Sequence, residues 1–271
     1  MYDTINERGR HMKILVFADL HYFGGTEKLF NTNRKLVEFA EPILDVFKEI
    51  AEKENATFAV NLGDIIQDTN DKALDLACLS LMFDRLKEFP CPVYSVLGNH
   101  DLKMMDTIDE VELLIGQNPA NFSIDAEGYH LVFLSPELHP ELGTARGGSY
   151  KTQYIGENTL AWLKEDLRQN VLPTFVFSHF PMADDPRVQD ECMFMKNRAD
   201  VKKILLESGY VKAVFVGHQH TPRFVEEYGI PYYIIGSPTV SLLEDGIPLG
   251  VFRMIDTDGD IFTVAERHAK L

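Results

Sequence analysis

The sequence predicts an α/β fold with a parallel sheet, and three observations support this prediction. Short apolar runs alternate with helical patterns through the first third of the chain, which is the order that β-α-β units require. Five apolar runs along the chain are followed within two residues by Asp, Asn or His, as expected where ligands meet the carboxyl ends of strands. The 271 residues contain no repeat, low-complexity stretch or linker, so we expect one compact domain over residues 12–271.

The N-terminal half carries the clearest alternation of strands and helices. Lys13 to Ala18 has the apolar composition of a buried strand, and apolar positions from Leu36 to Ile50 recur at helical spacing. Parallel strands joined by right-handed crossovers account for this half. In chain order we expect strand 13–18, helix 33–53, strand 57–62, helix 72–87, strand 92–97 and a short helix at 109–115.

In the C-terminal half the pattern changes to neighbouring and antiparallel strands. Residues 135–156 have no clear period and are expected to form a long loop. The acidic run at 256–260 has the wrong spacing for an EF-hand calcium loop, so a hairpin turn at Asp258-Gly259 is the better interpretation. The other expected elements are strands 121–124 and 129–134 around a turn at 125–128, helix 157–169, strand 172–177, helix 199–207, strand 211–216 and strands 223–227, 231–235, 249–255 and 261–265.

Composition and the N-terminus favour a cytoplasmic protein without a membrane segment. Residues 1–11 are polar and lack the apolar segment of a secretory signal. They are either native or an N-terminal extension left by cloning, with translation of the native chain starting at Met12. The cysteines Cys78, Cys91 and Cys192 are odd in number and widely spaced, which indicates buried or free thiols in a reducing compartment. No apolar stretch approaches the roughly 20 residues that span a bilayer.

The net charge limits the partners that the protein can bind. A formal charge of −16 argues against an extended nucleic acid, because tracking a phosphate backbone needs a basic surface. A small anionic substrate is compatible with this charge only if the site supplies its own cations. The oligomeric state is not indicated by the sequence.

The polar residues that follow the five apolar runs form a candidate dinuclear metal site. Within Asp19-x-His21 and His218-x-His220, an extended chain would direct both side chains the same way. Two carboxylates, four imidazoles and an amide can complete the shells of two first-row divalent ions if one carboxylate is shared. The candidate metal ligands are Asp19, His21, Asp64, Asn99, His179, His218 and His220.

Two such ions would explain how an acidic protein holds phosphate. Against two ionised Asp residues they leave an excess positive charge, and metals about 3.5–4 Å apart clamp the attacking and leaving oxygens of a displacement. A structural role could explain any one of the clusters, since a lone His at a strand end is commonly a hydrogen-bonding residue. Such a role explains five clusters together poorly. The remaining histidines lack this context and are expected on the surface or in packing: His11, His130, His139 and His268.

The motifs Asp-x-His, Gly-Asp, Gly-Asn-His-Asp, His-x-Pro and Gly-His-x-His, in this order from Asp19 to His220, resemble those of the calcineurin-like metallophosphoesterase superfamily. The resemblance implies a four-layer α-β-β-α sandwich of two mixed sheets flanked by helices. It also implies one metal held by Asp19, His21 and His220, a second held by Asn99, His179 and His218, and Asp64 bridging the two. His100 would stabilise the transition state or protonate the leaving group, and Asp101 would orient it. A carboxylate beside His100 would keep the imidazole charged, which suits an acid for an alkoxide leaving group.

The resemblance predicts a metal-dependent phosphodiesterase in which a metal-bridging hydroxide attacks phosphorus in line. Gly63 to Asp68 and the tail from Gly236 to Gly250 are similar to bacterial cyclic-nucleotide phosphodiesterases, whereas Asn31 to Leu36 resembles relatives that cleave ADP-ribose-type diphosphates. A non-catalytic scaffold on the same fold is a third hypothesis. Manganese, iron and zinc all accept this ligand set. Arg146 and Tyr150 could grip a phosphate or base, although a solvated loop is the commoner interpretation.

Overall fold

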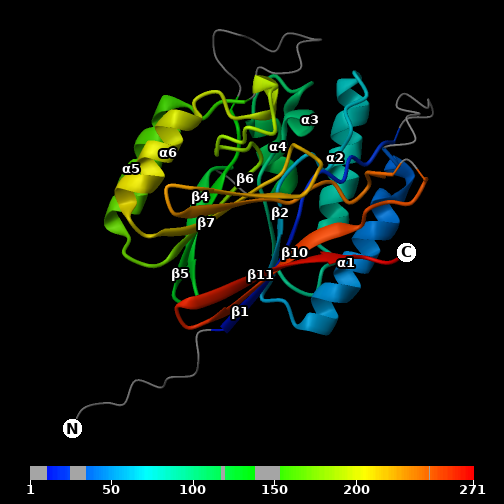
Figure 1. The fold of residues 1–271 in the computed structure, drawn as a ribbon. Coiled ribbons are helices and arrows are strands. Elements are labelled where there is room, and N and C mark those ends of the chain that lie inside the picture. Colours follow the sequence, from blue (N-terminus) through cyan, green and yellow to red (C-terminus); the bar gives the residue numbers. More distant parts are fainter. Residues whose placement is uncertain (1–10, 25–34, 117–119, 138–152, 244) are drawn as a thin grey trace.

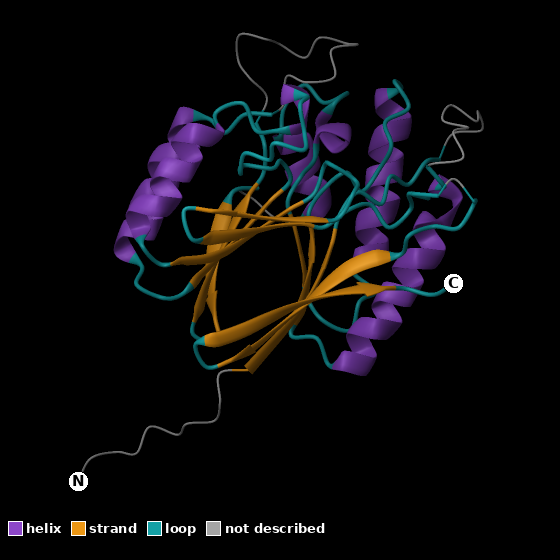
Figure 2. Cartoon of the chain, viewed as in Figure 1, coloured by secondary structure: helices purple, strands orange, loops and turns teal. Residues whose placement is uncertain are grey.

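The chain folds into two β-sheets that lie face to face, with helices on both outer faces. The computed structural model describes residues 11–24, 35–116, 120–137, 153–243 and 245–271. Figure 1 shows α1 and α2 beside one sheet, and α5 and α6 beside the other. Figure 2 shows the same four layers by secondary structure. The predicted sandwich of two mixed sheets flanked by helices is therefore confirmed.

The first sheet has five strands in the order β11-β10-β1-β2-β3. Strands β1, β2 and β3 run parallel, and β10 joins β1 in antiparallel orientation, so the sheet is mixed. The parallel strands end at one edge, which places the residues that follow them side by side. The bounds are β1 His11–Phe17, β2 Phe58–Asn61, β3 Val93–Ser95, β10 Val251–Asp258 and β11 Ile261–His268.

The second sheet has six strands in the order β4-β5-β6-β7-β9-β8. Its centre, β5-β6-β7-β9, is parallel, and the outer strands β4 and β8 pair in antiparallel orientation with their neighbours. The bounds are β4 Phe122–Ala126, β5 Tyr129–Leu134, β6 Thr174–Ser178, β7 Val211–Val216, β8 Arg223–Glu227 and β9 Ile230–Ile234.

The helices bury one face each against the sheets. Alternation along β1 decides which side chains they meet: Leu15 and Phe17 pack with α1 and α2, whereas Ile14 and Val16 face the second sheet. A third apolar cluster joins the second sheet to α5 and α6. The bounds are α1 Ala40–Glu54, α2 Lys72–Leu86, α3 Asn99–Leu102, α4 Asp109–Ile115, α5 Glu157–Gln169 and α6 Arg198–Ser208, with short 3-10 helices η1 Val37–Phe39 and η2 Glu191–Met193.

The helix expected from residue 33 begins later than predicted. Residues 25–34 lie outside the described part of the chain, and α1 starts at Ala40 after a 3-10 turn. Lys35 forms an antiparallel bridge with Val240, and the Leu36 amide donates to the Thr239 carbonyl at 2.8 Å. The apolar periodicity is real, but this tertiary pairing keeps Lys35 and Leu36 out of the helix.

Both predicted hairpins form, each with a turn one or two residues later than expected. Asp125 pairs with His130 in the first hairpin, so Asp125 and Ala126 belong to β4 rather than to the turn. In the second hairpin Asp258 pairs with Ile261, and the left-handed Gly259 lies in the turn. The predicted terminal extension and loop are only partly covered: residues 1–10 and 138–152, with Arg146 and Tyr150, lie outside the described residues, and His11 is the first residue of β1.

Candidate metal centre

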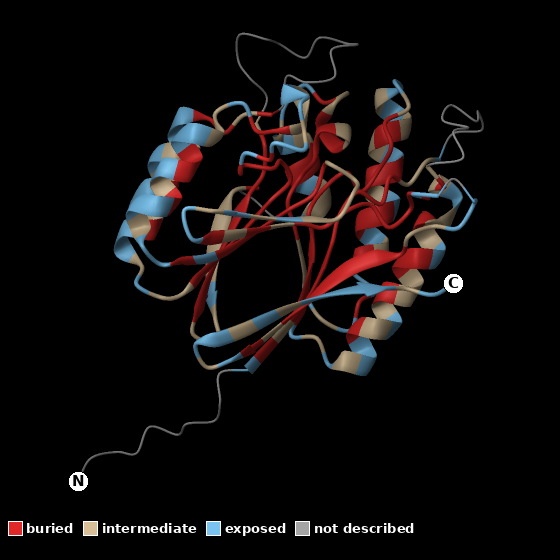
Figure 3. Ribbon diagram, viewed as in Figure 1, coloured by how far each residue is buried: buried red, intermediate tan, exposed pale blue. Residues whose placement is uncertain are grey.

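The seven candidate metal ligands lie together at the carboxyl edges of both sheets. Asp19 and Asp64 follow β1 and β2, and Asn99 opens α3 just beyond β3. From the second sheet, His179 follows β6 directly, while His218 and His220 follow β7. Figure 3 shows that buried residues continue from the strands into the loops at this upper edge. Residues far apart in the sequence are therefore gathered by the sandwich, as the sequence predicts.

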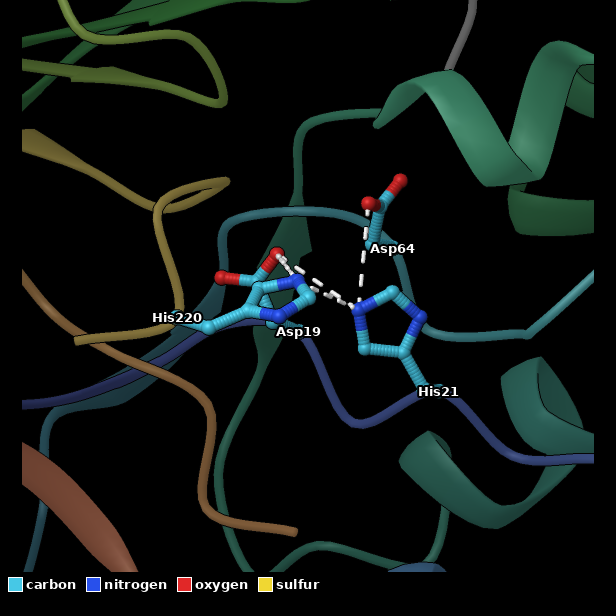
Figure 4. Close-up of side chains that lie close together, drawn as sticks. All are labelled: Asp19, His21, Asp64 and His220. Atoms are coloured by element: carbon cyan, nitrogen blue, oxygen red, sulfur yellow. Dashed lines mark hydrogen bonds and ion pairs between the residues drawn. The ribbon is translucent and has the colours of Figure 1, made fainter. Parts of the chain in front are cut away.

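Four of these residues form a first cluster, drawn in Figure 4. One ligand atom from each of Asp19, His21, Asp64 and His220 lies within 4.8 Å of the others. His21 Nε2 lies 3.9 Å from Asp19 Oδ1 and 4.0 Å from Asp64 Oδ2. Asp19, His21 and Asp64 are fully buried. A cluster of two carboxylates and two imidazoles of this size could hold a metal ion.

Asp64 also belongs to a second cluster, with His179 and His218. His179 Nε2 lies 3.3 Å from Asp64 Oδ2 and 3.2 Å from Asn99 Oδ1. The other ring nitrogen, Nδ1, donates to the Leu62 carbonyl at 2.8 Å, which fixes the ring. The Asp64 carboxylate is thus shared between the two groups, as the sequence requires for a dinuclear site.

Several buried polar atoms at this site have no hydrogen bond, which is a condition that a bound cation would satisfy. Asp64 Oδ2 and His218 Nδ1 are buried without a hydrogen bond. His218 Nε2 contacts the Cys192 carbonyl at 3.1 Å, so the unpartnered Nδ1 carries the lone pair. His21 Nε2 and His220 Nε2 face each other at 2.9 Å. This set of nitrogen and oxygen donors fits two divalent ions.

The protonation of the imidazoles agrees with this interpretation. Burial lowers the pKa of His218 to about 3 and holds the pKa values of His21 and His220 well below the usual value. Neutral imidazole is the form that binds metals. Burial also lowers the pKa of His179, but the Asp64 carboxylate outweighs burial and raises this pKa to about 9. A cation beside Asp64 would compete with that proton.

The backbone at the site is strained in a pattern that the sequence does not reveal. Asp19, His21, Asp64, His218 and His220 all have positive φ angles, between 50° and 67°. Non-glycine residues rarely adopt this region, and such strain concentrates at functional sites. The predicted extended conformation of the two i, i+2 pairs is therefore wrong. The left-handed turns send His218 and His220 into different clusters, whereas an extended chain would direct them together.

Two glycines give the carboxylates their space. A Cβ atom at Gly98 would collide with the Asp64 carboxylate, and one at Gly217 would lie 2.8 Å from Asp19 Oδ2. The backbone then holds the same carboxylates, because the His100 amide donates to Asp64 Oδ1 at 2.8 Å and the His218 amide to Asp19 Oδ2 at 2.9 Å. One oxygen of Asp64 is thus engaged, and Oδ2 is left directed into the site.

The predicted contact between Asp101 and His100 is wrong. Asp101 accepts hydrogen bonds from the backbone amides of Asp64, Ile65 and Gly98 at 2.8–3.0 Å, so it fixes the loop that carries Asp64. A neighbour in sequence points elsewhere here because α3 begins at Asn99 and turns Asp101 inward.

Asp68, which the sequence analysis did not assign to the site, makes the contact instead. Asp68 Oδ1 lies 2.5 Å from His100 Nδ1, and Asp68 Oδ2 lies 2.5 Å from Lys103 Nζ. Burial raises the pKa of Asp68, but the hydrogen bonds from His100 and Lys103 outweigh it and lower this pKa. His100 Nε2 points back toward the centre, 3.9 Å from Asp64 Oδ2. The motif Gly-Asp-x-x-x-Asp placed Asp68 near Asp64 but gave no sign of its partner.

The histidines that the sequence analysis left out of the centre are not among the residues of the two clusters, as far as the structure describes them. His11 and His268 are exposed, as expected, and His139 lies outside the described residues. His130 is a buried packing residue, only 3% exposed.

Comparisons with known proteins agree with the fold and the centre. A sequence profile of the Calcineurin-like phosphoesterase family matches residues 12–222, so the chain belongs to this family of metal-dependent phosphoester hydrolases. It is 26% identical over 221 residues to a manganese-dependent ADP-ribose/CDP-alcohol diphosphatase of Oryza sativa subsp. japonica, covering 66% of this chain and 67% of that protein. It is 23% identical over 159 residues to a probable cyclic nucleotide phosphodiesterase of Fibrobacter succinogenes, covering 58% of this chain and 57% of that protein.

A solved structure supports the fold. The dimetal phosphatase of Danio rerio superposes with a TM-score of 0.72 at 16% identity, covering 96% of this chain and 99% of that one. Family membership and the two clusters that share Asp64 identify the chain as a dimetal phosphoesterase with a dinuclear metal-binding site. None of the described helices is both long and apolar enough to cross a membrane.

Proposed function

We propose that the protein is a phosphodiesterase that cleaves a small, nucleotide-derived substrate with two metal ions. One ion would be held by Asp19, His21 and His220 and the other by Asn99, His179 and His218, with Asp64 as the shared ligand. The observation that carries this assignment is Asp64 Oδ2, a buried oxygen that belongs to both clusters and has no hydrogen bond. A dinuclear centre needs a carboxylate that is shared between its two metals. Two histidines with structural roles would not need one.

When bound, the two ions supply Lewis-acid polarisation of the phosphoryl oxygens and lower the pKa of a water that they share. The protein contributes the positions of the ligands and a proton donor. His100 is the proposed acid for the leaving oxygen, because its Nδ1 is held by Asp68 while Nε2 remains directed at the centre. Asp101 acts indirectly: it accepts hydrogen bonds from the backbone of the loop that carries Asp64, and so helps to position that carboxylate.

A phosphodiester is the first candidate substrate. The motifs of this chain resemble those of cyclic-nucleotide phosphodiesterases, and the Fibrobacter relative carries that name. An acid such as His100 is most useful when the leaving group is an alkoxide, as it is in a phosphodiester. The negative charge of the chain suits a small substrate that the ions attract, rather than a long nucleic acid.

A nucleoside-diphosphate conjugate is the second candidate. The rice relative is named a diphosphatase of ADP-ribose and CDP-alcohols, and the chain covers two thirds of its length. In both candidates the attacked phosphorus carries two ester or anhydride links and one negative charge. The same centre could therefore act on either substrate, and the side chains around the centre would decide which of the two is preferred.

The test is hydrolysis by the metal-stripped protein, with and without added manganese. Bis(p-nitrophenyl) phosphate, p-nitrophenyl phosphate, 3′,5′-cyclic AMP and ADP-ribose should be compared at equal concentration. Manganese-dependent cleavage of the diesters above the monoester supports the phosphodiesterase. No turnover of any substrate by protein that retains two ions would contradict the proposal and favour a non-catalytic scaffold.

Metal identity and location are part of the same proposal. Manganese is the first metal to test, because the rice relative is named manganese-dependent, while iron and zinc fit the same donor set. The three cysteines are free thiols, which supports a reducing, cytoplasmic location. Metal analysis of protein purified without chelators would decide among the three metals.

A further inference from the structure

A lysine side chain lies beside the proposed metal ligands and has no part in the chemistry described so far. Lys35 is anchored through its backbone by the bridge to Val240 and by the neighbouring hydrogen bond from Leu36 to Thr239. Its Nζ donates to Gln67 Oε1 at 3.2 Å. Gln67 is itself buried, with 1% of its surface exposed, so the Lys35 ammonium is held by a buried side chain next to the centre.

The ammonium group lies within electrostatic reach of the carboxylates of the centre. Burial lowers the pKa of Lys35, and the negative charges of Asp64, Asp19 and Asp68 oppose this effect. In turn the Lys35 charge contributes, after burial, to the low pKa values of His21 and His220. Lys35 is therefore close enough to the first cluster to act on it electrostatically.

Lys35 adds to the positive charge of the site when the centre is loaded. Two divalent ions against the carboxylates of Asp19 and Asp64 leave about two positive charges, by the arithmetic of ionised ligands. In a partly buried site the attraction of such a group of cations for an anion is stronger than in water. This favours a substrate with more negative charge than one phosphodiester.

The hydrogen bonds place Lys35 one side chain away from His100. Gln67 accepts from Lys35 with Oε1, and its Nε2 contacts both Asp68 Oδ1 at 3.3 Å and His100 Nδ1 at 3.1 Å. One amide side chain thus connects the lysine to the proposed acid. His100 serves the leaving group, so Lys35 adjoins the region that the leaving group occupies.

We propose that Lys35 binds the leaving phosphate of a substrate with two adjacent phosphates, a nucleoside diphosphate joined to a second group. This inference rests on the proposed two-metal function and selects its second candidate substrate. A leaving phosphate carries its own negative charge as it departs and needs a cation more than a proton. Lys35 supplies that cation through a charge-assisted hydrogen bond.

The reaction balances without any further reactant. A water oxygen forms a bond to the attacked phosphorus, and the bond from that phosphorus to the bridging oxygen breaks. The electron pair of the broken bond and the bridging oxygen remain with the second phosphate, beside Lys35. The products are two phosphate monoesters and two protons, which go to solvent when both monoesters are fully ionised.

The test compares two substrates across matched lysine variants. Manganese-loaded wild type, Lys35→Gln and Lys35→Arg are assayed with ADP-ribose and with bis(p-nitrophenyl) phosphate, and Lys212→Gln, exposed on β7, is the control. We expect Lys35→Gln to lower kcat/KM for ADP-ribose by roughly 10- to 100-fold, the value of a hydrogen bond to a charged group. The diester should change less than about threefold, and Lys35→Arg should restore most of the loss.

Binding without turnover gives a second measurement. Calorimetric titration of the two monoester products of ADP-ribose, AMP and ribose 5-phosphate, should show weaker binding of the one that carries the leaving phosphate to Lys35→Gln than to wild type at equal manganese content. An equal loss on both substrates, or no loss on either, would overturn the assignment of Lys35. Wild type that cleaves the diester but not ADP-ribose would overturn this inference alone, whereas wild type inactive on both would overturn the proposed function itself.

Discussion

Two groups of histidine and aspartate side chains can be compared within the described part of this protein, and one of them has the features of a metal site. At the far end of β5, His130 lies between two carboxylates: Nδ1 is 2.7 Å from Asp125 Oδ1, and Nε2 is 2.8 Å from Asp166 Oδ2. Both ring nitrogens are engaged, so the ring ties the β4-β5 hairpin to α5. The carboxylates outweigh burial and raise the pKa of His130.

At the metal centre the same residue types are arranged in the opposite way. The imidazoles of His21, His218 and His220 are kept neutral by burial, and Asp64 Oδ2 and His218 Nδ1 accept no hydrogen bond. The His130 group has ordinary strand geometry, whereas the centre holds left-handed residues. Residue type therefore does not distinguish a structural group from a metal site. Unsatisfied atoms and backbone strain do.

The largest expected effect is at the shared carboxylate. Asp64→Asn should lower turnover on the order of 10⁴-fold or more, because both ions lose a charged ligand and catalysis depends on both. Metal content after dialysis should fall well below two ions per chain. The isosteric amide keeps the shape, and Asp84→Asn on the surface of α2 is the control. Two tightly held ions in Asp64→Asn would refute the shared ligand.

The second effect separates chemistry from metal binding. His100→Ala should lower turnover of bis(p-nitrophenyl) phosphate by roughly 10²- to 10⁴-fold while the protein keeps its metals. His100 contacts Asp68 and Gln67, and its loss leaves the proposed ligands in place. Metal analysis and steady-state kinetics on the same preparation check both parts. Unchanged turnover would remove His100 from the mechanism.

A smaller effect is expected at Asp68, which replaces Asp101 as the partner of His100. Asp68→Asn should lower kcat by roughly 10- to 100-fold, because the ring loses the carboxylate that holds its orientation. Metal content and KM should stay close to wild type, a split that a general structural defect would not produce. Full activity of the variant would show that Gln67 alone positions the ring.

The smallest effect is expected at the His130 group, and it should leave the metal centre intact. A raised pKa in the folded state means that the charged His130 stabilises the protein below pH 6.5, and that this contribution is lost as pH rises through the raised pKa. His130→Gln should therefore reduce the free energy of unfolding by about 1–2 kcal/mol at pH 6 and by less at pH 9.

Urea unfolding of wild type and His130→Gln at the two pH values measures this difference. Turnover and metal content should be unchanged in the variant, which would sharpen the contrast between the two groups. A stability gap that widens toward pH 9 would contradict the charged state assigned to His130. Loss of metal in the variant would show that the two groups are coupled.

The sequence alone determined the α/β class, most element positions and the residues of the centre. Apolar periodicity locates α2, α4, α5 and β7 within about a residue, because the period depends only on which side chains are buried. The rule that parallel strands end at one edge was enough to gather Asp19, Asp64 and His218. The resemblance of the motifs to the family added the prediction of a second sheet packed against the first.

Only the tertiary structure decided the backbone geometry of the centre and which side chains around the ligands meet. The division of the ligands between two clusters matches what the motifs imply, but the left-handed turns that produce it were not predicted, and a helical turn directs Asp101 into the backbone while Asp68 reaches His100 from another loop. Val240 holds Lys35 beside the centre across more than two hundred residues of sequence. Periodicity records burial along one element, whereas these contacts depend on φ angles and on packing between elements, which no local pattern encodes.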